Sequence, residues 1–288
     1  MNSARSRQMI VGTCSLVQFL LALLLALAAI PTARAQDHPP VGDLASEIAV
    51  ALEKFSVKSA VVFNFTGPDT FVTPVGGMLA DDLSDVLARS SSKFKVIDRT
   101  RAMKALDSNR LAPEITSDPE VAAWIAESIG AELAIVGKLS SDGSNLRLTL
   151  DCLLAREGKS LQSFQATFPL SDKWKADLSM NIDQDSAVSA ILVPGTDAGI
   201  SVPHCSSCPA PEFPRATRGL EGSGKVLLQV VIGTDGKARD INILKTPDHG
   251  LTIVAVQNIQ KWRFQPARDA HKKPMVTRIP IELDFSRR

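Results

Sequence analysis

Two segments near the end of the chain carry apolar residues at every second position, and this pattern constrains the fold more than any other feature. Successive side chains of a strand point to opposite faces, so this spacing is typical of a strand with one face in a core. The segments are Lys225–Ile232 and Thr277–Phe285. Both are predicted to be strands, and Thr277–Phe285 is predicted to be half-buried because its apolar residues alternate with charged residues and Pro280.

The residues between these two segments predict a hairpin and one helix. Asp235-Gly236 is a short hairpin signal, and Ala238–Lys245 is the expected return strand. Leu251–Trp262 has its apolar residues at helical spacing. We therefore expect a small α+β domain at residues 204–288, in which Trp262 and Phe264 fill the core beyond the end of the helix.

Several short motifs of this region occur in a fixed order. They are Pro211-Glu-Phe-Pro214, Gly219-x-x-Gly222, Asp235-Gly-Lys237, Lys261-Trp-Arg-Phe-Gln-Pro-Ala267 and Lys273-Pro274. Together they resemble the TonB C-terminal domain over almost all of Pro203–Ser286. The resemblance implies a three-stranded antiparallel sheet packed with helices. It also implies that an extended segment of an outer-membrane partner adds to this sheet as a further strand.

The resemblance places the partner site on the last strand, Arg278–Phe285. Pro280 agrees with an edge position, because an edge strand tolerates one missing N–H group. Glu212 occupies a family position that contacts the partner peptide. The expected partner-binding residues are Glu212, Arg278, Ile279, Ile281, Leu283 and Phe285.

Residues 43–170 predict a separate α/β domain. The helix Leu44–Phe55, with Asp43 as its N-cap, starts an expected order α-β-α-β-α-α-β-β-β. Three segments of this region resemble the periplasmic modules of the TolB N-terminal, FlgO and CsgG-like type. They are Ala60–Phe65, Phe94–Arg99 and Gly130–Gly137. Residues 171–203 are expected to form a linker.

The first 35 residues predict export from the cytoplasm. Arg5 and Arg7 precede the apolar run Met9–Ile30, and Ala33-Arg34-Ala35 is a small-residue cleavage site. An uncleaved membrane anchor is the alternative, because about 20 apolar residues span a bilayer. The chain is thus expected in the periplasm, either soluble or tethered to the inner membrane.

Two cysteines lie close together after the expected linker. In an exported protein, Cys205 and Cys208 are expected to form a disulfide that stiffens the entrance to the last domain. A redox-active pair and a zinc site are the alternatives, although one pair beside His204 lacks the four ligands of a zinc site.

Composition and motifs restrict the function classes. The formal net charge is +1, and the chain lacks tyrosine, which argues against a nucleic-acid partner. No metalloprotease, hydrolase or nucleotide-binding motif occurs. We therefore expect no enzyme, cofactor or metal, with a thiol oxidoreductase using Cys205 and Cys208 as the remaining enzymatic alternative.

The expected function is an envelope protein that binds partner proteins through strand addition. Energy transduction for TonB-dependent transport, with inner-membrane motor proteins as further partners, is one possible form of it. The alternative is an envelope assembly or scaffold protein whose N-terminal domain carries the function.

Overall fold

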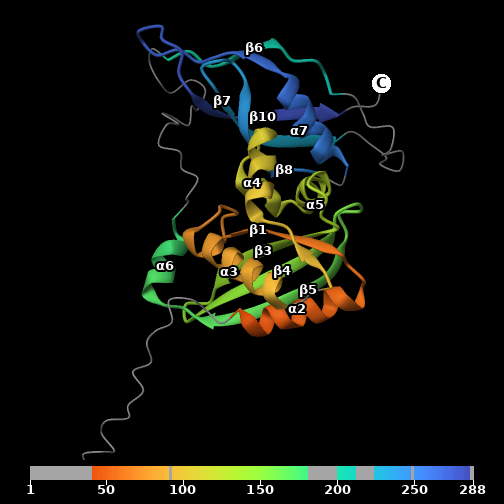
Figure 1. Ribbon diagram of the computed structural model, residues 1–288. Helices are drawn as coiled ribbons and strands as arrows, with labels where there is room; N and C mark the ends of the chain where they lie inside the picture. The colour runs from red at the N-terminus through yellow and green to blue at the C-terminus, as the bar shows by residue number, and fades with distance from the viewer. Residues whose placement is uncertain (1–40, 91–92, 181–199, 212–223, 248–249, 286–288) are drawn as a thin grey trace, which may run out of the picture. The chain divides into compact units, whose positions relative to one another are not determined.

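The computed structural model describes residues 41–90, 93–180, 200–211, 224–247 and 250–285 (Figure 1). The expected signal peptide or anchor, Glu212 and residues 181–199 of the expected linker lie outside these residues. Within the described residues, none of the helices is both long and apolar enough to cross a membrane.

The first part of the chain forms a mixed five-stranded sheet. Its strands are β1 (Ser59–Thr66), β2 (Lys95–Val96), β3 (Leu133–Ser141), β4 (Asn145–Leu154) and β5 (Ser160–Pro169), in the spatial order β2-β1-β3-β4-β5. β1 runs parallel to β2 and β3, whereas β4 is antiparallel to β3 and β5. The expected order of helices and strands is confirmed, with one additional 3-10 turn.

Helices cover both faces of the centre of this sheet. They are α2 (Gly42–Lys54), α3 (Pro74–Ser90), α4 (Arg99–Ser108), the 3-10 turn η1 (Pro113–Ser117), α5 (Pro119–Ser128) and α6 (Asp172–Leu178). One apolar cluster joins α2, α3 and α6 to one face, and the other cluster joins α4, η1 and α5 to the opposite face. This arrangement explains the nearly continuous apolar run of β1, because a strand covered on both faces has no solvated side.

The starts of three helices are defined by particular residues. Pro74 is the first residue of α3. Asp98 is the N-cap of α4, and its carboxylate accepts a hydrogen bond from Thr100 N at 2.8 Å. This bond holds the pKa of Asp98 below its usual range. The prediction for Asp43 is wrong, because Val41 is the N-cap of α2 and Asp43 lies inside the first turn.

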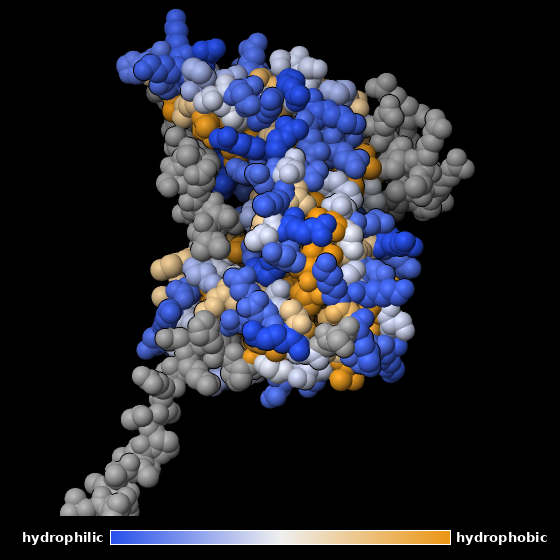
Figure 2. All heavy atoms as spheres, in the orientation of Figure 1, coloured by the Kyte–Doolittle hydropathy of each residue, from blue (hydrophilic) through white to orange (hydrophobic). Residues whose placement is uncertain are grey.

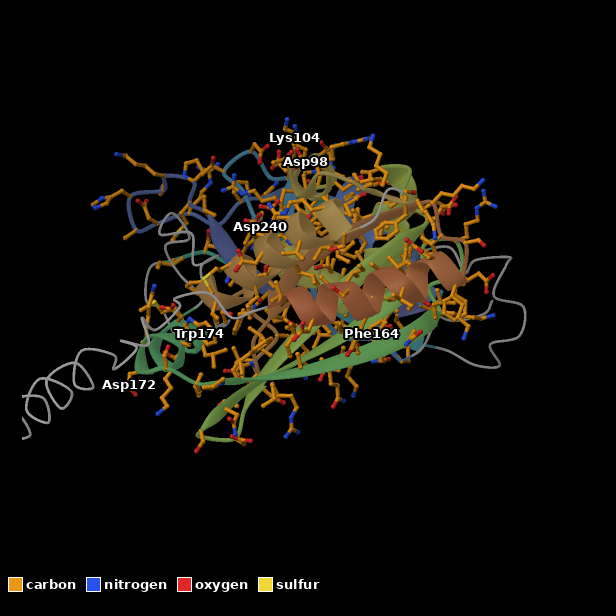
Figure 3. All side chains as sticks on the ribbon, turned by 60° about the horizontal axis from the view of Figure 1, so that its bottom comes forward. Asp98, Lys104, Phe164, Asp172, Trp174 and Asp240 are labelled. Atoms are coloured by element: carbon orange, nitrogen blue, oxygen red, sulfur yellow. A yellow bond between two sulfur atoms is a disulfide. The ribbon has the colours of Figure 1, made fainter. Side chains whose placement is uncertain are left out.

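The expected linker at residues 171–203 begins with a helix instead. Ser171 caps α6 by accepting a hydrogen bond from Trp174 N at 3.2 Å. The ring of Trp174 is buried in the same cluster as α2 and α3. Burial of this large ring stabilises a seven-residue helix that its own propensity would not maintain. Asp172 and Trp174 are labelled on this helix in Figure 3.

The last part of the chain contains the three-stranded antiparallel sheet that the resemblance implies. Its strands are β7 (Gly224–Ile232), β8 (Ala238–Lys245) and β10 (Thr277–Phe285), in the order β10-β7-β8. Helix α7 (Leu251–Lys261) packs on its apolar face. Two short strands, β6 (His204–Ser207) and β9 (Arg263–Gln265), pair with each other beside it.

The β7–β8 hairpin turns at the predicted glycine. Gly236 has φ = +73°, a conformation that favours glycine. A Cβ atom at this position would lie 2.1 Å from the carbonyl oxygen of Phe264, so the turn also approaches β9 closely. Phe264 N donates to Gly236 O at 2.9 Å. The glycine therefore serves both the turn and its contact with β9.

Candidate binding edge of the C-terminal sheet

β10 lies at one edge of the C-terminal sheet, as expected from the sequence. It pairs with β7 alone, without a register shift, from Thr277 opposite Ile232 to Phe285 opposite Gly224. Within the described residues, no strand pairs with its outer side. An edge strand of this kind presents a row of N–H and C=O groups that another strand can pair with.

Pro280 indicates which backbone groups point outward. Along an antiparallel strand, the backbone groups of alternate residues face the paired strand and the open side. Pro280 lacks an N–H group, yet it lies in the middle of a regular ladder opposite Gln229. Its backbone therefore faces the open side, together with Arg278, Glu282 and Asp284. Of these four residues, all except Pro280 offer an N–H group to an incoming strand.

The side chains of β10 follow the predicted alternation. Pro280, Glu282 and Asp284 are exposed, whereas Leu283 and Phe285 are each only 1% exposed. Arg278, Ile279 and Ile281 are half-buried, and the two isoleucines pack against the core cluster. The structure thus assigns Leu283 and Phe285 to the core, which leaves the outward backbone groups as the accessible part of the edge.

Charged side chains lie beside these outward groups. Lys225 Nζ of β7 donates to Glu282 Oε1 at 2.6 Å across the two strands. This hydrogen bond, with the charge of Glu282, raises the pKa of Lys225. Asp284 lies directly opposite Lys225 and is exposed. The edge therefore carries one carboxylate that is paired with a lysine, Glu282, and one that is exposed, Asp284.

The opposite edge of the sheet is partly closed by the chain itself. Leu111 forms a parallel β-bridge with Ile241 of β8. Ile241 N donates to Arg110 O, and Ala112 N donates to Ile241 O, both at 3.1 Å. These bonds occupy the middle of the outer side of β8. Strand addition is therefore better accommodated at β10 than at β8.

Side chains reinforce this contact between the two sequence regions. The guanidinium of Arg110 donates to Ala238 O at 3.3 Å and to Gln260 O at 3.0 Å. The carboxylate of Glu120 accepts from Gly250 N at 2.8 Å. The core cluster that includes α4 and α5 continues into the apolar face of the C-terminal sheet. No local pattern predicts this contact, because it joins residues that are far apart in the chain.

The predicted disulfide between Cys205 and Cys208 is confirmed, with a Cα–Cα distance of 6.0 Å. Cys208 and Trp262 are partly buried against the core cluster, and the Trp262 indole donates to Pro209 O at 3.1 Å. Trp262 is thus only partly in the core, contrary to the expectation, whereas Phe264 is 8% exposed and belongs to it. The indole instead joins the end of α7 to the disulfide segment.

The described cysteines bear on the alternative zinc site. A disulfide leaves no thiol pair for zinc, and the part of the chain that the structure describes holds no cluster of three potential metal ligands. The remaining described cysteine, Cys152, is buried in the first sheet, and burial raises its pKa to about 12. Its thiol is therefore protonated and inaccessible at neutral pH.

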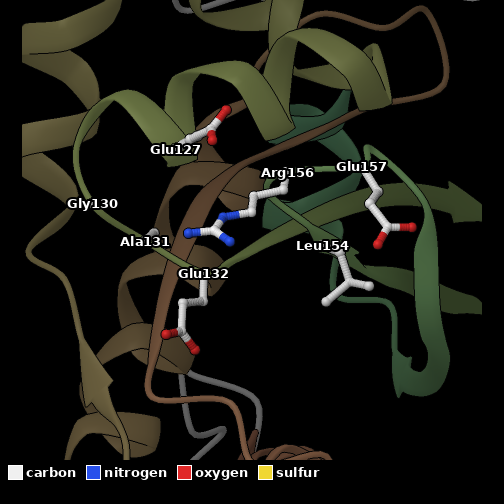
Figure 4. Close-up of a pocket in the computed structure, with 7 residues that line it drawn as sticks. All are labelled: Glu127, Gly130, Ala131, Glu132, Leu154, Arg156 and Glu157. Atoms are coloured by element: carbon white, nitrogen blue, oxygen red, sulfur yellow. The ribbon is translucent and has the colours of Figure 1, made fainter.

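A pocket of about 480 Å³ lies at the end of α5 and the start of β3 (Figure 4). Its charged lining residues are Glu127, Glu132, Arg156 and Glu157. In Figure 4 the guanidinium of Arg156 extends between the carboxylates of Glu127 and Glu132. These charges make the lining acidic, with one guanidinium among three carboxylates. Its residues follow no sequence motif, so the pocket is not predicted from the sequence.

On the face of the molecule that Figure 2 shows, hydrophilic residues predominate among those whose placement is described. The hydrophobic residues gather mainly in a narrow central area. This face therefore does not present a broad apolar surface of the kind that marks many interaction sites.

Comparison with known proteins supports the C-terminal resemblance. Residues 209–286 match the model of the family described as Gram-negative bacterial TonB protein C-terminal. The solution structure of the Pseudomonas aeruginosa TonB C-terminal domain is 27% identical, with 32% of this chain and 93% of that chain covered and a TM-score of 0.25. The resemblance to the TonB C-terminal domain is thus confirmed.

Other similar structures cover more of the chain at lower identity. The LpoB C-terminal domain from Salmonella enterica is 17% identical, with 45% of this chain and 96% of that chain covered and a TM-score of 0.38. TolB from Acinetobacter baumannii is 9% identical, with 66% of this chain and 39% of that chain covered and a TM-score of 0.27. No curated protein matches the sequence significantly. The family match supports a periplasmic envelope protein with a TonB-like domain.

Proposed function

We propose that this protein is an envelope adaptor that binds an extended segment of an outer-membrane partner along β10. The observation that carries the proposal is the open edge of β10 within a segment that matches the TonB C-terminal family. Backbone hydrogen bonds along the edge supply affinity in this kind of recognition, and nearby side chains supply selectivity. The role is binding, without a catalytic step.

The fixed position of the edge favours this role. β10 is held by a regular ladder with β7, and its apolar side chains are anchored in the core. A preorganised edge loses little conformational entropy when it binds. More of the free energy of the backbone hydrogen bonds then contributes to affinity. Transmission of energy from inner-membrane motor proteins is a further step of the proposal, and it requires the N-terminal segment to remain as an anchor.

Photocrosslinking from the edge tests the proposal in the native envelope. A photoreactive amino acid replaces Asp284, which is exposed on the outward-facing row of β10. We expect it to crosslink an outer-membrane protein through an extended segment identified by mass spectrometry. The same amino acid at Ser140, an exposed residue of β3, is the control position and should not give this product.

A pair of variants at Glu282 separates backbone pairing from side-chain contact. Glu282→Pro removes one outward N–H group, and it should abolish the crosslink while the domain stays folded. Glu282→Ala is the matched control, because it removes the carboxylate and its bond to Lys225 but keeps the N–H group. An unchanged crosslink in the folded Glu282→Pro protein would refute strand addition at β10. Partner capture through the first domain would then favour the scaffold function.

A further inference from the structure

The first sheet also ends in an open edge, formed by β5. This strand has ten residues, Ser160–Pro169, and it pairs only with β4. The ladder runs regularly from Gln162 opposite Cys152 to Pro169 opposite Asn145. Nothing in the described parts of the chain pairs with the outer side of this strand. It is thus a long edge whose backbone groups are available to another strand.

The composition of β5 contrasts with that of β10. β5 carries no charged residue, and its one proline is the last residue of the strand. Charged side chains and internal prolines are devices by which edge strands avoid indiscriminate pairing. β10 has both, with Pro280 in its middle and Glu282 and Asp284 on its solvated face. The two edges are therefore suited to different partners.

The two faces of β5 are unlike each other. Phe164 and Phe168 are buried on the side of α2 and α3, and Figure 3 shows Phe164 beside α2. Ser163, Gln165 and Thr167 are exposed on the other face. One face thus belongs to the core, while the other offers hydroxyl and amide groups that can hydrogen-bond across a strand pair.

Helix α2 packs over β5 in the same apolar cluster and carries exposed apolar residues. Val50 of this helix is 70% exposed, and Phe55, which follows its last turn, is 43% exposed. They are two of the five large hydrophobic residues that are exposed in the described parts of the chain. The helix that covers this edge thus has apolar as well as polar residues on its exposed surface.

We infer that two copies of this protein pair through antiparallel β5 strands to form one continuous sheet. A two-fold axis perpendicular to the sheet sets each strand against itself, so every contact must be self-compatible. Because the strand is uncharged throughout, no register of this pairing opposes like charges within the strand. The same axis puts both α2 helices on one face of the joined sheet, because each helix packs over its own β5. This self-association does not depend on the proposed binding at β10.

Sedimentation velocity of the full exported protein over a range of concentrations tests the inference. We expect a concentration-dependent dimer. When the two strands pair over their full length, the axis passes between Phe164 and Gln165. Gln165→Lys then brings an ammonium group from each copy next to the axis, and it should weaken dimerisation at least tenfold. Ser140→Lys is the matched control, because it adds the same charge to an exposed position two strands away on the same sheet. It should leave the dimer unchanged.

Amide hydrogen exchange locates the interface independently. In the wild-type protein, peptides from residues 160–169 should exchange more slowly at high than at low concentration, and this difference should disappear in Gln165→Lys. A monomer at every concentration would overturn the inference. So would a dimer that Gln165→Lys leaves intact, or one that Ser140→Lys weakens equally.

Discussion

Leu111 and Ile241 form a parallel β-bridge that ties the segment after α4 to the outer side of β8. The bridge closes one edge of the C-terminal sheet with the protein's own chain, whereas among the described residues no strand pairs with the outer side of β10. This asymmetry favours β10 as the site of the proposed strand addition.

Arg110 tests the strength of this internal contact. Arg110→Ala removes the guanidinium that donates to Ala238 O and Gln260 O, and it should lower the free energy of unfolding by about 1–3 kcal/mol. Arg110→Lys retains the positive charge but lacks the planar guanidinium that donates to both carbonyl groups. It should therefore restore only part of the lost unfolding free energy. Denaturant unfolding of the full protein measures both variants. Equal stability of Arg110→Ala and wild type would show that the contact contributes little.

Leu283 and Trp262 test the division between core and surface. Leu283 is 1% exposed, so Leu283→Ala should destabilise the protein by about 2–5 kcal/mol. Trp262 is only partly buried, so Trp262→Ala should cost less than the ~3–5 kcal/mol typical of a fully buried ring. Thermal or denaturant unfolding compares the two. A loss for Trp262→Ala within or above that range would contradict the partial burial of its indole.

The disulfide should act locally. Its loop is short, with a sequence separation of 3, so a chain-entropy estimate gives a contribution of no more than about 2 kcal/mol. Replacing Cys205 and Cys208 together with serine should speed amide exchange in β6 and β9 and leave β7 and β10 protected. Loss of protection throughout the C-terminal sheet would show instead that the disulfide maintains the whole domain.

Cys152 should make stability depend on alkaline pH. Burial raises its pKa from 9.0 to about 12 in the folded protein, so the unfolded chain loses the proton first as the pH rises. The contribution of the protonated, buried Cys152 thiol to the free energy of unfolding is complete below about pH 9. It is lost progressively toward pH 12. Since lysines titrate in the same range, the comparison is with Cys152→Ala, whose unfolding free energy should fall less steeply there. If the unfolding free energies of the wild type and of Cys152→Ala fell equally steeply with pH, the raised pKa of Cys152 would be contradicted.

Local patterns predicted much of the fold. β8 and β10 have the expected boundaries because alternation and turn signals are short-range properties of the sequence. Helix α6 was missed because a single buried ring, Trp174, stabilises it, and no periodic pattern marks such a contact. Trp262 followed the helical pattern, yet its indole bonds to Pro209 in a segment that sequence spacing does not relate to it.

The edge position of the candidate strand β10 was predicted, but the arrangement around it was not. Alternation and Pro280 identified β10 as a peripheral strand. The sequence did not reveal that Leu111 closes the opposite edge, because that bridge depends on the tertiary arrangement. It also did not separate Leu283 and Phe285, whose side chains belong to the core, from the outward backbone groups of Glu282 and Asp284.

Residue-resolved amide exchange of β10, with and without the crosslinked partner segment, tests the central claim most directly. In the free protein, the outward N–H groups of Glu282 and Asp284 should exchange rapidly, and those of Ile281 and Leu283, which face β7, should exchange slowly. In the complex, we predict that Glu282 and Asp284 become protected like their neighbours. Rapid exchange of both residues in the complex would contradict strand addition at this edge.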